Sequence, residues 1–411
     1  MTKMIKLSLA AAVAVSAFAT TATAGSLENA IKDTTISGKF MVGYNYADNK
    51  LADTTSNTNE YDIDVTVTTK VNDVISATFG VEADHDLATS DVTTDAGKGN
   101  EIGITKLYFT AKTDVATVMV GKQKQPTPFL DDERGDGVVA LIPAGPVTIA
   151  AGHFTGMNGG TTANVTTDTY KGGLINLNLS QRDISALALI GAAGPVNYSA
   201  WYVTASNADD SEVITDSAIA TNALEKGLDA YTVNLNGKFG PVSVDATYSS
   251  AELQAVSGSK FDSETLLKVT AAMKVDAINL TAGYAQTNDS KHNLAGADLN
   301  ARLHGVDLTS DNDAKTNMAM EILDIDTVID AKAFLIGAST TFGKTTLSAT
   351  YLNGDSDAAE LDFDELDLKV TYAMSKNFSL EAIYAMSDLD FKADANDLEV
   401  DTALVRMTYK F

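Results

Sequence analysis

The sequence predicts an all-β fold, a transmembrane antiparallel β-barrel of about 18 strands, with roughly 16 as the alternative. Three observations predict this fold. Apolar and polar residues alternate along many short segments, which is the period of a strand with one oily and one wet face. Tight turns and long polar stretches alternate between these segments, as periplasmic turns and extracellular loops do. The last segment ends on an aromatic residue, Phe411.

The C-terminal segment, 401–411, shows the alternation most clearly. Counting back from the end, every second residue is apolar: Phe411, Tyr409, Met407, Val405 and Ala403. Lys410, Thr408 and Arg406 fall on the other face. The segment is also about as long as the roughly 9–11 residues that a tilted strand needs to cross a bilayer. An amphipathic strand that ends a soluble sheet would look similar, so the rest of the chain must separate the two interpretations.

The N-terminus predicts export. Lys3 and Lys6 precede an apolar run from Leu7 to Ala19, and Ala22-Thr23-Ala24 forms a small-residue cleavage motif. We therefore expect a signal peptide at 1–24 and a single barrel domain at 25–411. The apolar run is too short for a transmembrane helix. An exported barrel is expected in the outer membrane of a Gram-negative bacterium.

Charge and composition narrow the class of protein. The formal net charge is −26, and loss of the two signal-peptide lysines gives −26 − 2 = −28 for the mature chain. Such acidity disfavours a nucleic-acid partner. The chain has no cysteine, so disulfides and thiolate chemistry are excluded. It has only six prolines, as expected where sheet hydrogen bonds dominate.

The alternation predicts the strands in order. They are 35–47, 60–71, 74–85, 101–112, 115–124, 137–143, 146–155, 184–192, 195–205, 230–239, 242–250, 264–275, 277–286, 331–342, 344–353, 363–374, 377–387 and 398–411. The tight turns include Asn72-Asp73, Ala144-Gly145 and Ser375-Lys376. An even count lets the first and last strands pair antiparallel. Closure leaves no unpaired edge in lipid, where each unsatisfied backbone group costs several kcal/mol.

Aromatic residues are sorted between the two predicted ends of the strands. At the loop ends they are mostly tyrosine: Tyr44, Tyr46, Tyr61, Tyr231, Tyr248, Tyr284, Tyr351 and Tyr384. At the turn ends they are mostly phenylalanine, with two tyrosines: Phe239, Phe342, Phe378, Phe411, Tyr372 and Tyr409. Two aromatic belts are typical of a membrane barrel, and a soluble β-protein has no reason to form them.

Three stretches of the chain resemble one family. They are residues 25–33 leading into Ile36-Ser37-Gly38, residues 107–123, and the ending from Val405 to Phe411. Together they resemble the Campylobacter-type (epsilonproteobacterial) major outer membrane porins. The resemblance implies an 18-stranded, homotrimeric porin for small hydrophilic solutes and ions. It does not extend by eye over residues 155–345, so the functions of the loops there stay open.

The third long loop, Gln125 to Asp136, is the candidate pore constriction, because in porins that this chain resembles this loop folds into the pore. Its charged residues are Asp131, Asp132, Glu133, Arg134 and Asp136. We expect its acids to face bases of the wall, for which the candidates are Lys39, Lys122, Lys124 and Arg406. Opposed charges would set a transverse field that orients polar solutes. The alternative is a solvated surface loop.

Charge on the predicted inner faces is balanced, so most excess negative charge lies in the loops. A negative vestibule predicts a mild preference for cations. The alternatives are an exported adhesin or surface protein and a substrate-specific barrel channel. Trp201 is the single tryptophan and gives no sign of an aromatic slide for a specific solute.

Other chemistry has little support in the sequence. His85, His153, His292 and His304 lack metal-ligand spacing, and we expect no enzymatic activity. Asp311 and Asp313 are candidate Ca²⁺ ligands, but the sixth position of this stretch lacks glycine and Ile322 stands at the twelfth, where a calcium loop has glutamate. We therefore expect no cofactor, with Ca²⁺ as the alternative.

Several further expectations concern partners and loops. The expected partners are outer-membrane lipid, lipopolysaccharide, and the barrel-assembly machinery through Phe411. Gly343-Lys344-Thr345 lacks the first P-loop glycine, because Ala338 stands there, and is interpreted as a turn. The Ala- and Gly-rich region 138–203 is a candidate subunit contact. The long loop 287–330 is expected to carry a short helix or cover the pore mouth.

Overall fold

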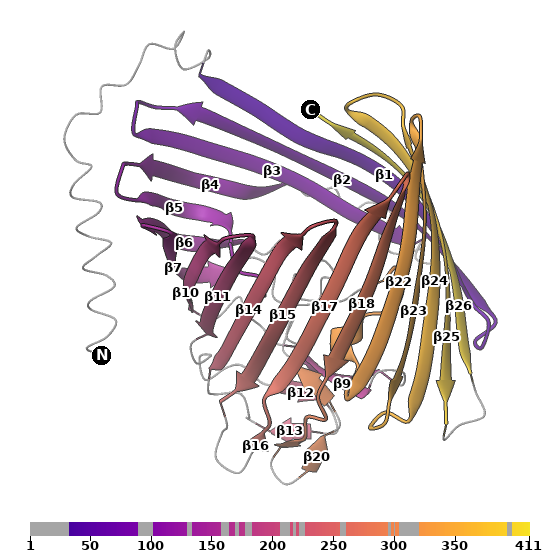
Figure 1. The fold of residues 1–411 in the computed structure, drawn as a ribbon. Helices are drawn as coiled ribbons and strands as arrows, with labels where there is room; N and C mark the ends of the chain where they lie inside the picture. The colour runs from indigo at the N-terminus through magenta and orange to yellow at the C-terminus, as the bar shows by residue number, and fades with distance from the viewer. Residues whose placement is uncertain are drawn as a thin grey trace.

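The computed structural model describes residues 33–88, 102–129, 134–157, 164–168, 172–176, 183–205, 214–216, 219–221, 227–254, 260–294, 297–299, 301–303, 320–392 and 397–411. These residues form a closed antiparallel β-barrel (Figure 1). The predicted signal peptide lies outside them. In the described part of the chain, no helix is long and apolar enough to cross a membrane.

The barrel sheet has 18 strands, so the alternative of 16 is wrong. In chain order they are β1 (Thr34–Asn49), β2 (Thr54–Lys70), β3 (Ile75–Ala88), β4 (Gly103–Lys112), β5 (Thr117–Lys124), β6 (Arg134–Ala144), β7 (Val147–Met157), β10 (Ile184–Ala193), β11 (Val196–Ala205), β14 (Leu228–Phe239), β15 (Val242–Leu253), β17 (Glu264–Val275), β18 (Ile278–Thr287), β22 (Ala331–Phe342), β23 (Thr345–Ser356), β24 (Leu361–Ala373), β25 (Phe378–Phe391) and β26 (Leu398–Lys410). Each pairs antiparallel with the next strand of the barrel, and every predicted strand corresponds to one of them. The predicted fold is confirmed.

The barrel closes where β1 pairs with β26, a pairing that we call the closing seam. Its register runs from Lys39 opposite Lys410 to Asn49 opposite Val400. At the C-terminal end, Gly38 and Phe411 exchange two backbone hydrogen bonds, with N···O distances of 3.0 and 3.1 Å. The seam therefore satisfies the backbone groups that the first and last strands would otherwise expose to lipid.

The two rims differ. Tight turns lie along one rim, and the longer connections lie along the other, together with short strands such as β12 (Ile214–Asp216), β13 (Ile219–Thr221) and β16 (Lys260–Phe261) (Figure 1). Several tight turns use a left-handed residue, among them Gly343 with φ 60° and Asp276 with φ 52°. Gly343 thus lies in the β22–β23 turn, as predicted, and a side chain there would be strained.

Other short strands in the long connections pair with one another and form two small sheets. One contains β16, β19 (His292–Leu294) and β20 (Ala297–Leu299). The other contains β8 (Asn164–Asp168), β9 (Gly172–Asn176) and β21 (Ala301–Leu303), with β21 parallel to β9.

The outer wall is apolar. Large hydrophobic side chains are exposed at every second position, as in β1, where Phe40, Val42 and Tyr44 alternate with buried Met41 and Gly43. Members of both predicted aromatic belts are exposed: Tyr44, Tyr61, Tyr231, Tyr248, Tyr351 and Tyr384 at the loop ends, and Phe239, Phe342, Tyr372, Tyr409 and Phe411 at the turn ends. An apolar exterior with an aromatic girdle at each end is what a bilayer requires.

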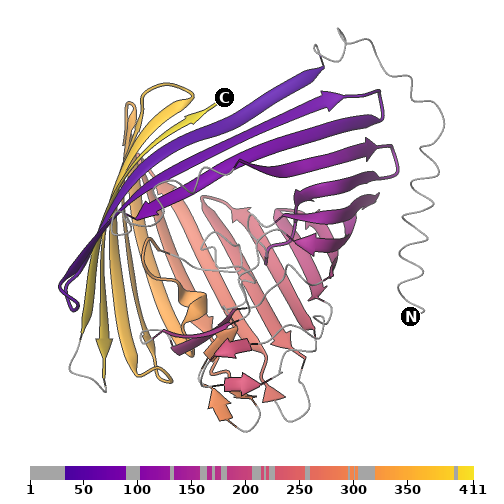
Figure 2. The ribbon, with the colours of Figure 1, turned by 180° about the vertical axis from the view of Figure 1, so that it is seen from behind.

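The interior is not a uniform pore. Buried apolar side chains of β10 to β26 form a cluster inside the barrel, together with residues of the connection between β18 and β22. This connection contains the short 3-10 helix η3 (Ile325–Thr327), and the turn lies inside the barrel wall in Figure 2. A short helix in this loop was one of the two expectations from the sequence.

Candidate pore lining and its ion pairs

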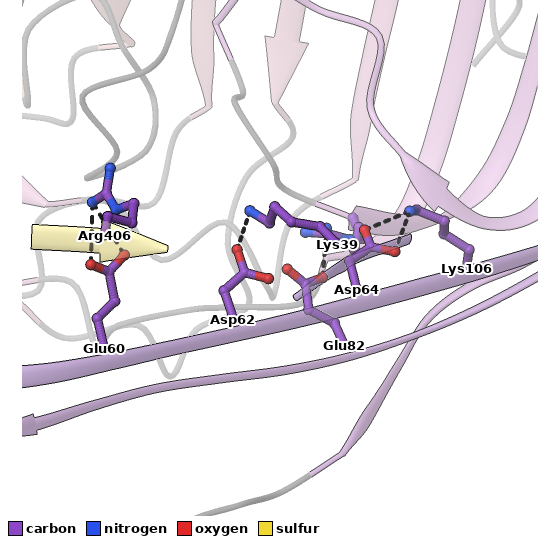
Figure 3. Close-up of polar contacts among 8 residues, drawn as sticks. Lys39, Glu60, Asp62, Asp64, Glu82, Lys106 and Arg406 are labelled. Carbon is purple, nitrogen blue, oxygen red and sulfur yellow. Dashed lines mark hydrogen bonds and ion pairs between the residues drawn. The ribbon is translucent and has the colours of Figure 1, made fainter. Parts of the chain in front are cut away.

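The charged lining of the lumen begins on β2 and β3. Glu60, Asp62 and Asp64 occupy alternate positions of β2, and the residues between them, Tyr61 and Ile63, are exposed on the outer wall. The acids therefore face inward, as the alternation predicts. Figure 3 shows these three carboxylates and Glu82 of β3 meeting bases that reach toward them from neighbouring strands.

Arg406 of β26 reaches Glu60 of β2 across the strand between them. Its guanidinium Nη2 lies 3.2 Å from Glu60 Oε2 (Figure 3). Both residues stand opposite Gly43 of β1 in their registers. A Cβ at residue 43 would lie 2.8 Å from Glu60 Oε2, so glycine leaves the space that this ion pair occupies.

Lys106 of β4 repeats this arrangement one step around the wall. Its Nζ lies 3.0 Å from Asp64 Oδ2 and donates to Thr66 Oγ1 at 2.8 Å. The strand between is β3, and Gly80 there stands opposite both Lys106 and Thr66. A Cβ at residue 80 would lie 2.9 Å from Cβ and Cδ of Lys106. Glycine at this position therefore leaves the space that the Lys106 side chain occupies.

Two further pairs complete the row of bases and acids on this side of the barrel. Lys39 of β1 forms an ion pair with Asp62, and Arg134 Nη2 of β6 lies 2.7 Å from Glu82 Oε2. The Arg134 side chain is only 10% exposed and that of Glu82 16%, whereas the Lys39 side chain is 37% exposed. The exposed pair adds little stability, but removing one partner of a buried pair is costly.

The lining continues beyond the closing seam. Arg406 Nη1 lies 3.9 Å from Glu381 Oε1 of β25, and Lys369 Nζ of β24 lies 3.0 Å from Glu381 Oε2. Together with Glu60, these residues form a chain of alternating charges that spans five strands, with β1 contributing no charge to it. At the loop end of the seam, Lys50 Nζ lies 2.9 Å from Glu399 and 3.2 Å from Asp401. These hydrogen bonds raise the pKa of Lys50, so it stays charged.

The chain between β18 and β22 lies against the inner wall at β24, two strands from the seam. We call residues 320–330 the strap. The backbone N–H groups of Ile322 and Leu323 donate to the two carboxylate oxygens of Glu365 on β24, at 2.8 and 2.6 Å. The N–H of Glu321 donates to Asp367 at 3.3 Å. Glu365 is fully buried, so these amide N–H groups replace the hydrogen bonds that water would donate to its carboxyl group.

The other end of the strap is tied to the strand ends. Thr287 Oγ1 donates to the carbonyl of Val328 at 2.6 Å and accepts from the N–H of Ala331 at 2.8 Å. Ser356 Oγ donates to the carbonyl of Ile329. Leu323, Ile325 and Val328 of the strap belong to the buried cluster, as do several inward residues of the wall: Leu266, Ala285, Ala333, Leu352, Leu361 and Phe363. The strap therefore fills part of the lumen with apolar side chains.

The third long loop also begins inside the barrel. Gln125, Thr127 and Phe129 are buried, and Phe129 belongs to the same apolar cluster as the strap. Lys122 stands opposite Asp136, which is exposed, and Lys124 stands opposite Arg134 in the β5–β6 register.

The acids that the sequence places at the constriction, Asp131, Asp132 and Glu133, lie outside the described residues. Lys39 and Arg406, expected to face those acids, pair with Asp62 and Glu60 of the wall within the described residues.

Within the described ranges, no group of three or more His, Asp or Glu side chains could hold a metal ion. Asp311 and Asp313, the Ca²⁺ candidates, lie outside those ranges. His153 Nδ1 forms a hydrogen bond of 2.9 Å with Ser185 Oγ between β7 and β10.

Comparison with protein families decides the identity. The model of the Campylobacter major outer membrane protein family matches residues 2–411. The chain belongs to this family. It is therefore an outer-membrane porin-family barrel of a Gram-negative bacterium, as the resemblance implied. No curated protein matches the chain.

Solved structures support the fold at low sequence identity. OpdQ of Pseudomonas aeruginosa is similar with a TM-score of 0.62 and 13% identity, covering 93% of this chain and 99% of that one. OpdO of the same organism gives a TM-score of 0.62 at 11% identity, covering 93% of this chain and 98% of that one. The outer membrane protein OprD gives 0.61 at 12% identity, covering 92% and 94%.

Sequence reasoning missed Glu60 and Lys106 as lining residues, and it missed Glu365 as the anchor of the strap. Glu60 lies at the first residue of the predicted second strand, where the alternation had not yet assigned a face. Gly43 and Gly80 carried a usable signal, because an inward glycine beside charged neighbours makes room for a long side chain from two strands away.

Proposed function

We propose that the protein forms a water-filled channel for passive diffusion of small hydrophilic solutes and ions, mildly selective for cations, and that it works as a homotrimer. The observation that carries this proposal is the row of ion pairs on the inner face of a wall whose outer face is apolar. Lysine or arginine costs about 2–4 kcal/mol at the lipid-facing midplane, so the row faces inward, where water in the lumen can solvate it.

The ion pairs suit weak, repeated contact with solutes. Each base lies beside an acid, so a passing ion meets partners of either sign without a deep binding site. The acidic chain, −26 in formal charge, concentrates cations at the mouth. Cations therefore enter more readily than anions, while neutral solutes pass according to size.

The test is liposome swelling with neutral sugars of increasing mass. General diffusion predicts rates that fall smoothly with solute size and do not saturate with concentration. Vesicles with the folded barrel that swell no faster than empty vesicles would contradict the proposal. Crosslinking in native membranes tests the trimer, which predicts a ladder ending at three chains.

A substrate-specific channel is the second candidate. The strap and the start of the third loop favour it, because both place buried apolar residues inside the barrel and reduce the open lumen. It predicts swelling rates that saturate for one class of solute. We further propose that the protein has no catalytic role and needs no cofactor, so chelation of divalent cations should leave conductance unchanged.

A further inference from the structure

The strap brings acidic residues into the lumen without any base. Residues 320–330 include Glu321, Asp324 and Asp330, and no lysine or arginine. Because Glu365 and Asp367 hold the backbone amides at residues 321–323, the position of Glu321 is fixed relative to β24. The strap lies inside the barrel (Figure 2), so this acid is added to the lining rather than to the outer surface.

Glu321 lies beside the chain of charges that crosses the closing seam. Arg406 of β26, Lys369 of β24 and Glu381 of β25 act on it electrostatically, as does Asp367. Arg406 also bonds Glu60, so the base that acts on Glu321 electrostatically already has an acid of the wall as its partner.

The charges there do not cancel. The chain Glu60–Arg406–Glu381–Lys369 holds two acids and two bases and sums to zero. Glu365 is buried and occupied by two amide N–H groups. Asp367 of the wall and Glu321 of the strap add acids to this balanced chain, and Glu321 is only partly buried.

We propose that Glu321 is a specificity-determining residue of the channel, which makes the lumen beside the strap net negative and favours cations, including small organic solutes that carry an ammonium group. The proposal rests on the proposed function as a channel and places part of its cation preference on one side chain. A fixed charge inside a lumen acts on ions at closer range than charges of the vestibule.

The environment of Glu321 also gives the preference a pH dependence. Burial raises the pKa of Glu321 above its ordinary value of 4.5, Arg406 and Lys369 lower it, and Asp367 and Glu381 raise it, with a net upward shift. The carboxylate is therefore fully charged above the raised pKa. As the pH falls through that value, Glu321 takes up a proton and its share of the cation preference is lost.

The test compares reversal potentials in a KCl gradient for the full chain and for Glu321→Gln, which keeps the shape of the side chain. A unit charge several ångströms from an ion in water is worth on the order of RT, so we expect the cation-to-anion permeability ratio to fall roughly two- to threefold. Asp73→Asn is the control, because it removes the same charge from a fully exposed turn residue. It should leave the ratio unchanged.

Two further measurements complete the test. The wild-type ratio should fall on acidification at a pH above 4.5, and Glu321→Gln should remove that step. Ethanolamine hydrochloride in place of KCl should show the same loss for Glu321→Gln. A conducting, cation-selective wild type whose ratio Glu321→Gln leaves unchanged would overturn this inference alone. A wild type without channels would instead overturn the proposed function.

Discussion

Arg406 and Glu60 belong to strands that are not paired with each other, yet their side chains meet at 3.2 Å across the closing seam. The strand between them, β1, contributes Gly43 at the crossing point. Lys106 and Asp64 meet in the same way across Gly80. At these two crossings, an inward glycine lets a long side chain pass over the strand that separates the partners.

Substitution of Gly43 should change ion selectivity without changing any charge. In Gly43→Ala, the new Cβ would lie 2.8 Å from Glu60 Oε2, and the flexible carboxylate must move away from Arg406. The substitution shifts this partly buried ion pair without removing either charge, so the barrel should still fold.

We expect Gly43→Ala to shift the reversal potential in a KCl gradient. Gly337→Ala is the control, because its Cβ would meet nothing nearer than 3.5 Å. Equal potentials for the wild type and both variants would show that the Glu60–Arg406 pair has no influence on permeation.

Removal of Lys106 should strengthen the cation preference. In Lys106→Met, Asp64 loses its base and its charge acts on passing ions, which we expect to raise the cation-to-anion permeability ratio roughly two- to threefold. Lys376→Met, in an exposed turn, removes the same charge far from the row and should have no effect. A lower ratio in Lys106→Met would contradict the assignment of Lys106 to the lumen.

Glu365 should hold the strap in place. Glu365→Ala leaves the N–H groups of Ile322 and Leu323 unpaired, at about 1–3 kcal/mol for each buried group. We expect the strap to leave the wall and single-channel conductance to rise. Glu252→Ala, at an exposed position, is the control. Unchanged conductance in Glu365→Ala would mean that the strap does not narrow the path.

The pKa of Glu321 predicts that the strap docks more firmly in acid. The pKa of Glu321 is raised when the strap is docked. Protonated Glu321 therefore contributes its full share to the stability of docking below pH 4.5, and this share is lost as the pH rises through the raised pKa. The chain has no cysteine, so Ile325→Cys provides a single buried thiol that reports strap opening.

Labelling of this thiol, relative to an exposed Asp357→Cys control, should increase with pH. Addition of Glu321→Gln should weaken the dependence. If the relative labelling rate of Ile325→Cys without the second substitution stays constant with pH, the prediction that the strap docks more firmly in acid is wrong.

Regular features of the fold could be predicted from the sequence because they are local. The alternation in 401–411, the turn at Gly343 and the aromatic positions each follow from a few neighbouring residues and from the bilayer's demand for an apolar exterior. The position of each strand followed from the same rule, so all strands of the barrel were predicted.

Pairing inside the lumen could not be predicted in this way. Arg406 and Glu60 are 346 residues apart in sequence, and their contact depends on the register of two strand pairs. The docking of the strap on Glu365 depends on the path of a long loop, which alternation does not describe. Alternation placed Lys39 and Arg406 correctly in the lumen, but it could not show which acids they meet.

Planar-bilayer conductance of the refolded protein in a salt gradient tests whether the charged inner row lines a water-filled channel. We expect ohmic steps in groups of three, with a reversal potential on the cation side. A folded, heat-modifiable barrel that gives no conductance steps, or a reversal potential on the anion side, would contradict it.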